Sequence, residues 1–104
     1  MPFLLTGLAV LLLSPASQAA PRTHRIVIDK MKFGPVPAGI RPGDRITWVN
    51  KDLFRHTATA NDGSFDIDLR PGTSGSVTVK RGGTIAVTCR YHPGMRAMIK
   101  VAAR

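Results

Sequence analysis

The segment Thr84–Met95 reads TIAVTCRYHPGM, an alternating strand pattern that runs into a short loop. Ile85, Val87 and Cys89 share one phase of the alternation, and two threonines and an alanine hold the other. Side chains of a β-strand point alternately to its two faces, so this pattern predicts a strand over Thr84–Cys89 with one apolar face. Cys89 is expected to point into the core at the end of this strand, where the chain has to turn.

The rest of the chain repeats this kind of pattern. Short β-branched runs are separated by turn residues such as Pro42-Gly43-Asp44 and Asn61-Asp62-Gly63. No window has a helical stripe, and four prolines would interrupt any helix. Spacings near ten residues predict an all-β sandwich or barrel. The expected strands are Arg25–Lys30, Ile46–Asn50, His56–Ala60, Ser76–Lys80, Thr84–Cys89 and Ala97–Ala102.

The first twenty residues have a different composition from the rest. Met1–Ala20 contains no charged side chain, and Phe3–Leu13 is a mostly apolar run followed by Ser-Pro and small residues. This is the pattern of a cleaved export signal, with the cut expected after Ala19. An uncleaved membrane anchor is the alternative, but the run is shorter than the about 20 apolar residues that a spanning helix needs. We therefore expect residues 1–19 to be a signal peptide and residues 20–104 to be a single domain in the periplasm, without a membrane anchor.

Composition restricts the possible functions. The chain has 104 residues, 15 Lys and Arg against 6 acidic residues, and a net charge of +9. One domain of this size has little room for a large catalytic cleft, so we do not expect an enzyme. Its six aromatic residues offer no stacking platform for nucleic acid, so an acidic protein or a membrane surface is the expected partner. A single cysteine rules out an internal disulfide.

The loop after the strand carries the chemistry. Cys89, His92 and Met95 follow the spacing C-x2-H-x2-M, and His56 begins another predicted strand. A thiolate, two imidazoles and a weak thioether form the ligand set of a mononuclear copper electron-transfer site. Zinc would prefer a fourth strong ligand. His24 is the alternative source of the second imidazole, but it precedes the first predicted strand.

These residues resemble a family. The carriers of the resemblance are Pro42-Gly43-Asp44, Trp48-Val49-Asn50, His56, Gly63-x-Phe65-Asp66 and Cys89-x-x-His92-Pro93-x-Met95. With them, the chain is similar to the cupredoxins, or blue-copper proteins, and most similar to the amicyanin group. The resemblance implies a Greek-key β-sandwich of about eight short strands with one type 1 copper site near one end. It also implies that His56, Cys89 and His92 are equatorial ligands and that Met95 is the axial one.

Residues next to the ligands are expected to support the site. Asn50, Thr57 and Pro93 are predicted to lie just outside the ligand set. Many members of the family have Asn directly after the first ligand histidine, and its amide helps to tie the two ligand-bearing segments together. Thr57 stands there in this chain. It keeps a backbone N–H for the cysteine sulfur but lacks the amide. Pro93 fixes its own φ and removes one N–H near the sulfur.

The family resemblance implies a one-electron carrier that cycles between Cu(II) and Cu(I). His92 would be the electron port, within an apolar patch that includes Pro93, Tyr91 and either Met31 or Phe33. A positive rim is expected from Arg55, Arg90 and Arg96, and it would receive a transient, acidic redox protein. A monomer is expected. Two alternatives stay open: a periplasmic protein that stores or delivers copper with the same ligands, and a metal-free binding module.

Overall fold

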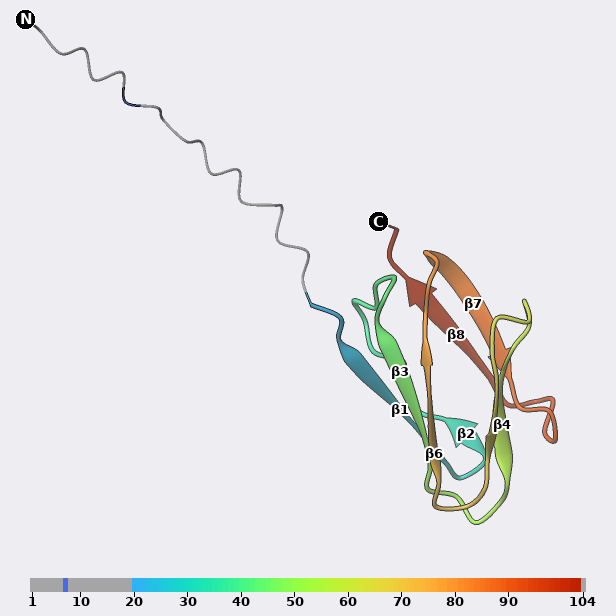
Figure 1. Ribbon diagram of the computed structural model, residues 1–104. Coiled ribbons are helices and arrows are strands. Elements are labelled where there is room, and N and C mark those ends of the chain that lie inside the picture. Colours follow the sequence, from blue (N-terminus) through green and yellow to red (C-terminus); the bar gives the residue numbers. More distant parts are fainter. Residues whose placement is uncertain (1–6, 8–19, 104) are drawn as a thin grey trace, which may run out of the picture.

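The computed structural model describes Gly7 and residues 20–103, and within that part the chain is folded into strands without any helix (Figure 1). The predicted export signal lies outside the described residues, apart from Gly7. No helix long and apolar enough to cross a membrane occurs among the described residues. Eight strands are formed: β1 (Thr23–Asp29), β2 (Lys32–Phe33), β3 (Arg45–Asn50), β4 (His56–Ala60), β5 (Asp66–Leu69), β6 (Ser74–Thr78), β7 (Gly83–Thr88) and β8 (Arg96–Val101).

The strands form two four-stranded sheets that face each other. One sheet has the order β2-β1-β3-β6 and the other the order β5-β4-β7-β8. Only β1 and β3 pair in parallel, whereas the remaining neighbours are antiparallel. The connections β3–β4, β5–β6 and β6–β7 cross between the layers (Figure 1). The predicted all-β Greek-key sandwich is confirmed.

Six of the strands correspond to the runs predicted from alternation, with shifts of a few residues. β6 begins at Ser74 rather than Ser76, and β7 ends at Thr88, so that Cys89 is the first residue of the loop. The alternation of apolar and polar residues did not predict β2 or β5. Both are short, with two and four residues.

The core lies between the sheets and centres on Trp48 of β3, which is completely buried. Its ring meets the Phe33 ring edge-on with centroids 5.6 Å apart, and it also packs near Phe65. The two sheets approach closely at Gly75, where an added Cβ would lie 2.5 Å from Cγ2 of Ile67. The other fully buried large apolar residues are Ile26, Ile28, Ile40, Ile46, Leu69, Val87 and Ile99.

His24 lies at the start of β1, paired in register with Ile46, so it sits at the opposite end of this sheet from Asn50. Its Nε2 is 2.8 Å from Oδ2 of Asp44. Asp44 also accepts hydrogen bonds from the backbone N–H groups of Arg22 and Arg41. The Arg22 bond first, and then the His24 bond, lower the pKa of this carboxyl to about 2. His24 is thus part of a structural pair at the far end of the molecule.

Candidate metal centre

Cys89 and His56 meet inside the sandwich although they are far apart in sequence. His56 is the first residue of β4, and Cys89 directly follows β7, the strand that pairs antiparallel with β4. The sulfur of Cys89 is 3.7 Å from Nδ1 of His56, and both residues are completely buried. The burial of Cys89 confirms the phase that was predicted from the alternation in Thr84–Cys89.

A carboxylate fixes the orientation of the His56 ring. Nε2 of His56 is 2.8 Å from Oδ2 of Asp52. The same oxygen accepts from the N–H of Met31, and Oδ1 of Asp52 accepts from the N–H of Leu53. These contacts, above all the one with His56, lower the pKa of Asp52. Because Nε2 is engaged, Nδ1 is the nitrogen that faces Cys89. A carboxylate on the outer ring nitrogen is the usual support of a metal-binding histidine.

Asp52 was not predicted from the sequence. The signal for it was a carboxylate four residues before the candidate histidine in a short loop. The loop between β1 and β2 contributes to the same contact, because Lys30 and Met31 both have a positive φ, of 50° and 61°. Left-handed backbone at two non-glycine residues is unfavourable. Here it presents the N–H of Met31 to Asp52 at 2.9 Å.

Asn50 holds the loop from which Asp52 and His56 project. Its buried amide Nδ2 donates to the carbonyl oxygens of Phe54, at 2.7 Å, and Leu69, at 3.0 Å. Its Oδ1 accepts from the N–H of Asp52 at 2.9 Å. The contacts with Phe54 and Asp52 shape the β3–β4 loop from within, and the contact with Leu69 ties Asn50 to the end of β5. The predicted place of Asn50 near the site therefore has a structural basis, although Asn50 touches the loop rather than Cys89.

Thr57 connects the two chain segments that carry Cys89 and His56. Its backbone N–H lies 3.4 Å from the sulfur of Cys89, as expected from the sequence. Its hydroxyl Oγ1 accepts from the backbone N–H of Arg90 at 2.8 Å. The Thr57 hydroxyl thus links the two segments, in place of the asparagine amide that many family members have at this position.

The loop 89–95 is tightly folded on itself. The N–H of His92 donates to the carbonyl of Cys89 at 3.3 Å, and the N–H of Met95 donates to that of His92 at 2.8 Å. The N–H of Cys89 in turn donates to the carbonyl of Met95 at 3.2 Å. Met95 is buried and His92 is partly exposed. The ring centroids of His92 and His56 are 5.1 Å apart, whereas Pro93 lies at the surface.

The separation of Cys89 and His56 suits two ligands of one metal ion. With bond lengths of about 2.3 Å to sulfur and about 2.0 Å to nitrogen, as for zinc, a thiolate and an imidazole on one ion at about 120° would be about 3.7 Å apart. This is the separation of Cys89 and His56. Over residues 20–103, no three His, Cys, Asp or Glu side chains converge on one point. Cys89 and His56 are the pair that the structure brings together. Metal ligation by these two residues, and by His92 and Met95, stays a prediction.

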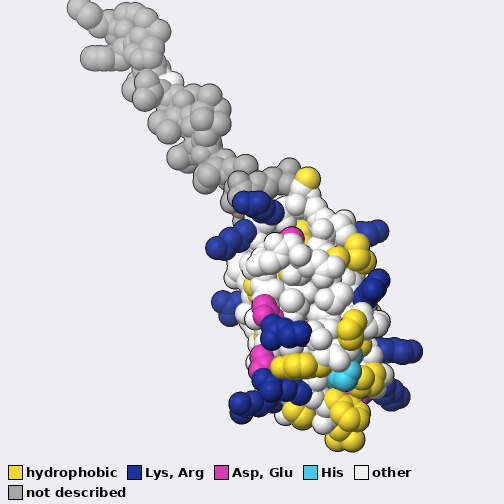
Figure 2. All heavy atoms as spheres, turned by 90° about the vertical axis from the view of Figure 1, so that its right-hand side faces the viewer, with side chains coloured by type: hydrophobic (Ala, Val, Ile, Leu, Met, Phe, Trp, Pro, Cys, Tyr) yellow, Lys and Arg dark blue, Asp and Glu magenta, His cyan; other side chains and the backbone are white. Residues whose placement is uncertain are grey.

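Hydrophobic side chains cover this end of the molecule. Figure 2 shows a histidine among yellow side chains, with Lys and Arg around them. Leu53 is 87% exposed and Phe54 is 56% exposed, and both belong to the loop that precedes His56. Neither residue was predicted from the sequence. Tyr91 is exposed as predicted, whereas Met31 and Phe33 are partly buried and pack against the core, Phe33 on the ring of Trp48.

Two of the three predicted rim arginines are already neutralised. Arg55 forms an ion pair with Asp68 and also lies over the Tyr91 ring, 5.4 Å from its centroid. Arg90 forms an ion pair with Asp66. Arg96 donates from Nε to the carbonyl of Pro93 at 3.3 Å and has no carboxylate partner among the described residues. The rim is therefore less positive than the sequence alone indicated.

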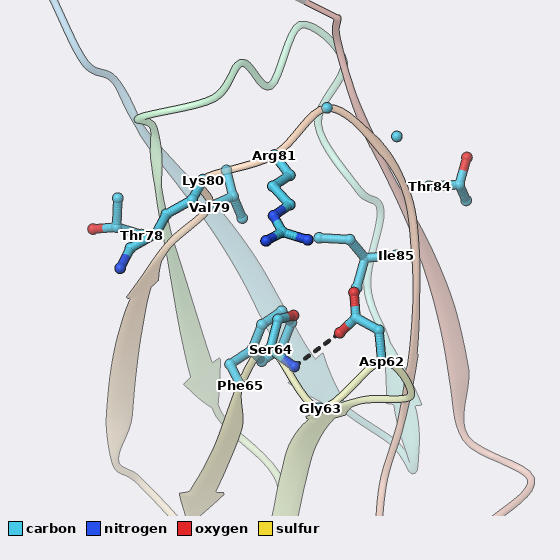
Figure 3. Close-up of a pocket in the computed structure, with 12 residues that line it drawn as sticks. Asp62, Gly63, Ser64, Phe65, Thr78, Val79, Lys80, Arg81, Thr84 and Ile85 are labelled. Carbon is cyan, nitrogen blue, oxygen red and sulfur yellow. Dashed lines mark hydrogen bonds between the residues drawn. The ribbon is translucent and has the colours of Figure 1, made fainter.

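A cavity of about 490 Å³ lies elsewhere, between the β4–β5 turn and the β6–β7 loop (Figure 3). Asp62, Arg81 and Ile85 are among its lining residues, and the only hydrogen bond drawn there joins the N–H of Ser64 to Asp62. It lies at the start of β7, whereas Cys89 follows the end of that strand. None of the predicted site residues lines it.

Comparisons with known proteins agree with this geometry. Residues 2–101 match the sequence model of a family described as the cupredoxin-like domain. No curated protein sequence matches the chain significantly. A structure of a reduced amicyanin variant is similar with a TM-score of 0.70 and 23% identity, covering 82% of this chain and 87% of that one.

Two further solved structures are similar. Another reduced amicyanin variant has 25% identity and a TM-score of 0.67, over 75% of this chain and 80% of its own. A purple cupredoxin from Nitrosopumilus maritimus has 19% identity and a TM-score of 0.64, over 75% of this chain and 98% of its own. The predicted similarity to the amicyanin group is confirmed.

Proposed function

Since the chain belongs to the cupredoxin-like family, we propose that it is a periplasmic electron carrier with one type 1 copper ion. It takes up one electron from a redox partner and passes it to another, and it turns over no substrate. The observation that carries this proposal is the buried pair of Cys89 sulfur and His56 Nδ1, 3.7 Å apart and next to the loop of His92 and Met95.

The proposed ligands are His56, Cys89 and His92, with Met95 as a weak axial ligand. A copper ion held there supplies a reversible one-electron couple. The surrounding residues supply rigidity. Asp52 holds the ring of His56 with Nδ1 toward the site.

The sulfur also has a polar neighbour that stabilises its charge. The N–H of Thr57 points at Cys89 and stabilises negative charge on the thiolate. The fit of Thr57 at this position depends on its hydroxyl as well, because that group holds the N–H of Arg90 at the base of the ligand loop. We infer that this link keeps the loop in one shape while charge changes at the sulfur.

His92 is the proposed electron port, because it is the partly exposed histidine of the ligand loop. Leu53, Phe54, Tyr91 and Pro93 are exposed on the loop that precedes His56 and on the loop that carries His92. We propose that they form the apolar docking patch, where a partner need not displace bound water from charged groups. Steering of an acidic partner then comes from the overall charge of +9 rather than from Arg55 and Arg90. Transient binding of a monomer suits rapid exchange of partners.

The first test is spectroscopic. One equivalent of Cu(II) is added to residues 20–104, and visible absorption and EPR spectra are recorded beside those of Cys89→Ala. An intense blue band and a narrow copper hyperfine splitting, both lost in the variant, are expected. A colourless protein, or a Cu(II) signal that survives the loss of Cys89, would contradict the proposal.

A second measurement separates an electron carrier from a copper-delivery protein. A carrier is expected to keep its metal through repeated reduction and reoxidation, because both oxidation states are held by the same rigid ligands. If reduction releases the ion to a competing chelator within one cycle, delivery of copper is the better assignment.

A further inference from the structure

A closed set of hydrogen bonds lies on the outer face of the β5-β4-β7-β8 sheet, beside the ligand loop. The N–H of Arg90 donates to Thr57 Oγ1 at 2.8 Å, and Thr57 Oγ1 is 2.8 Å from Thr59 Oγ1. Thr59 Oγ1 donates to Asp66 Oδ1 at 2.8 Å, and the guanidinium of Arg90 pairs with Asp66 Oδ2. Both ends of this chain of contacts belong to Arg90, the residue that follows Cys89: its backbone N–H at one end and its guanidinium at the other.

The direction of every hydrogen bond in this ring follows from chemistry. A carboxylate only accepts, so the hydroxyl hydrogen of Thr59 is used on Asp66. Thr59 then has only its oxygen to offer Thr57, so Thr57 must be the donor between them. The hydroxyl hydrogen of Thr57 is thus directed away from Arg90, and its lone pair is left to accept the Arg90 N–H. Asp66 therefore orients both hydroxyls.

We propose that Asp66 is a positioning residue for the ligand loop, acting through Thr59 and Thr57 on the backbone N–H of Arg90. Its second oxygen holds the side chain of the same arginine, so one carboxylate fixes both ends of Arg90. This inference rests on the proposed function in one respect only: the loop that it positions is taken to be the copper-binding loop. Thr57 is also the residue whose N–H points at the Cys89 sulfur.

The alternative is that Asp66 makes an ordinary surface ion pair of little consequence. The chain offers a matched control for this. Asp68 lies two residues further along β5 and forms an ion pair with Arg55. The two ion pairs are similarly exposed: the side chains of Asp68 and Arg55 are 45% and 50% exposed, and those of Asp66 and Arg90 are 49% and 52% exposed. Asp68 makes no hydrogen bond to a threonine hydroxyl among the described residues.

The test compares Thr59→Val, Asp66→Asn, their double variant and the control Asp68→Asn. Both Asn variants lose one negative charge from the same strand, and Thr59→Val keeps the shape of the side chain while it removes the hydroxyl. The first readout is the hydrogen-exchange rate of the Arg90 amide, measured by NMR on the metal-free protein. Loss of one link is expected to raise this rate by up to about tenfold.

The double variant distinguishes a shared circuit from two separate contacts. Thr59→Val and Asp66→Asn are expected to have non-additive effects on the Arg90 amide, because both act on the same relay: Thr59→Val interrupts it, and Asp66→Asn replaces the acceptor-only carboxylate that fixes its direction. Asp68→Asn is expected to change this rate less than about twofold, as suits an exposed ion pair. An unchanged rate in Thr59→Val, or an equal increase in Asp68→Asn, would overturn the inference.

The second readout is taken on the protein with one equivalent of Cu(II). The energy of the sulfur-to-copper band and the reduction potential are expected to shift in Thr59→Val and Asp66→Asn and to stay in place in Asp68→Asn. Unshifted values in the first two variants would show that the relay does not reach the ligand loop. If the unmodified protein gives no blue band, the proposed function fails, and the exchange rates still decide whether Asp66 positions Arg90.

Discussion

Replacement of Asn50 by alanine is expected to destabilise the metal-free protein by about 3 kcal/mol. The value comes from three side-chain hydrogen bonds, to Phe54 O, Leu69 O and Asp52 N, at a net contribution of about 1 kcal/mol each. Asn50 is completely buried, so water cannot easily replace these bonds. A domain of this length usually has a stability of about 5–15 kcal/mol, so the loss is a large fraction of the total.

Urea denaturation followed by tryptophan fluorescence measures this change, and thermal unfolding provides a check. For a domain of this size, about 3 kcal/mol corresponds to a fall in Tm of about 12–24 °C. Thr47→Val serves as the control, because Thr47 is on the same strand and its hydroxyl bonds to Ser76 at an exposed position. This control is expected to change stability by less than about 0.5 kcal/mol.

Asn50→Asp tests the reasoning in a second way. It keeps the oxygen that accepts from Asp52 but turns a second oxygen toward the carbonyls of Phe54 and Leu69, which then lack donors. We expect it to be at least as destabilising as alanine. A loss below about 1 kcal/mol in both variants, with an unchanged denaturant slope, would refute the idea that this amide organises the β3–β4 loop.

Three further predictions concern other parts of the molecule. Because the pKa of Asp44 is lowered from 3.8 to about 2, the stabilisation of the fold by this carboxylate is complete above about pH 4 and is lost as the pH falls toward 2. Between about pH 4 and about pH 2 the urea midpoint of Asp44→Asn should therefore fall less than that of the unmodified protein, and equal falls would contradict this role of Asp44. Gly75→Ala places a Cβ about 2.5 Å from Ile67 and should cost about 1–3 kcal/mol, so an unchanged Tm would contradict the packing described. Leu53→Ser should leave Tm unchanged but should slow electron transfer with an acidic cytochrome, measured by stopped flow, and Phe54→Ser should slow this reaction too. Rates equal to those of the unmodified protein would show that this loop is not part of the docking patch.

Much of the fold could be predicted from residue alternation, because most strands are half-buried and alternate in polarity. β7 is the clearest example, since its pattern also gave the burial of Cys89. β5 was not indicated, because Asp-Ile-Asp-Leu is only four residues long and aspartate is unfavourable in strands. β2 is too short for any period to appear.

The site could be predicted only where it depends on residue type and spacing. Cys89 and His56 were found in this way, and the structure brings them together. Asp52 could not be found, because its role depends on how the β3–β4 loop folds back on His56. The neutralisation of Arg55 and Arg90 could not be predicted either. Because β5 was not predicted, there was no reason to place Asp66 beside Arg90 or Asp68 beside Arg55.

The strand order has a consequence for the time course of folding. Only β1–β2, β4–β5 and β7–β8 pair with their neighbours in sequence, whereas β1–β3, β3–β6 and β4–β7 join distant segments. Sandwiches dominated by such long-range pairing fold in about milliseconds to seconds. Until β7 docks on β4, the thiol of Cys89 is open to solvent, and two unfolded chains can join through it under oxidising conditions. Burial of this cysteine is therefore also a form of chemical protection, and it is complete only when β7 has paired with β4 and the other sheet has covered them.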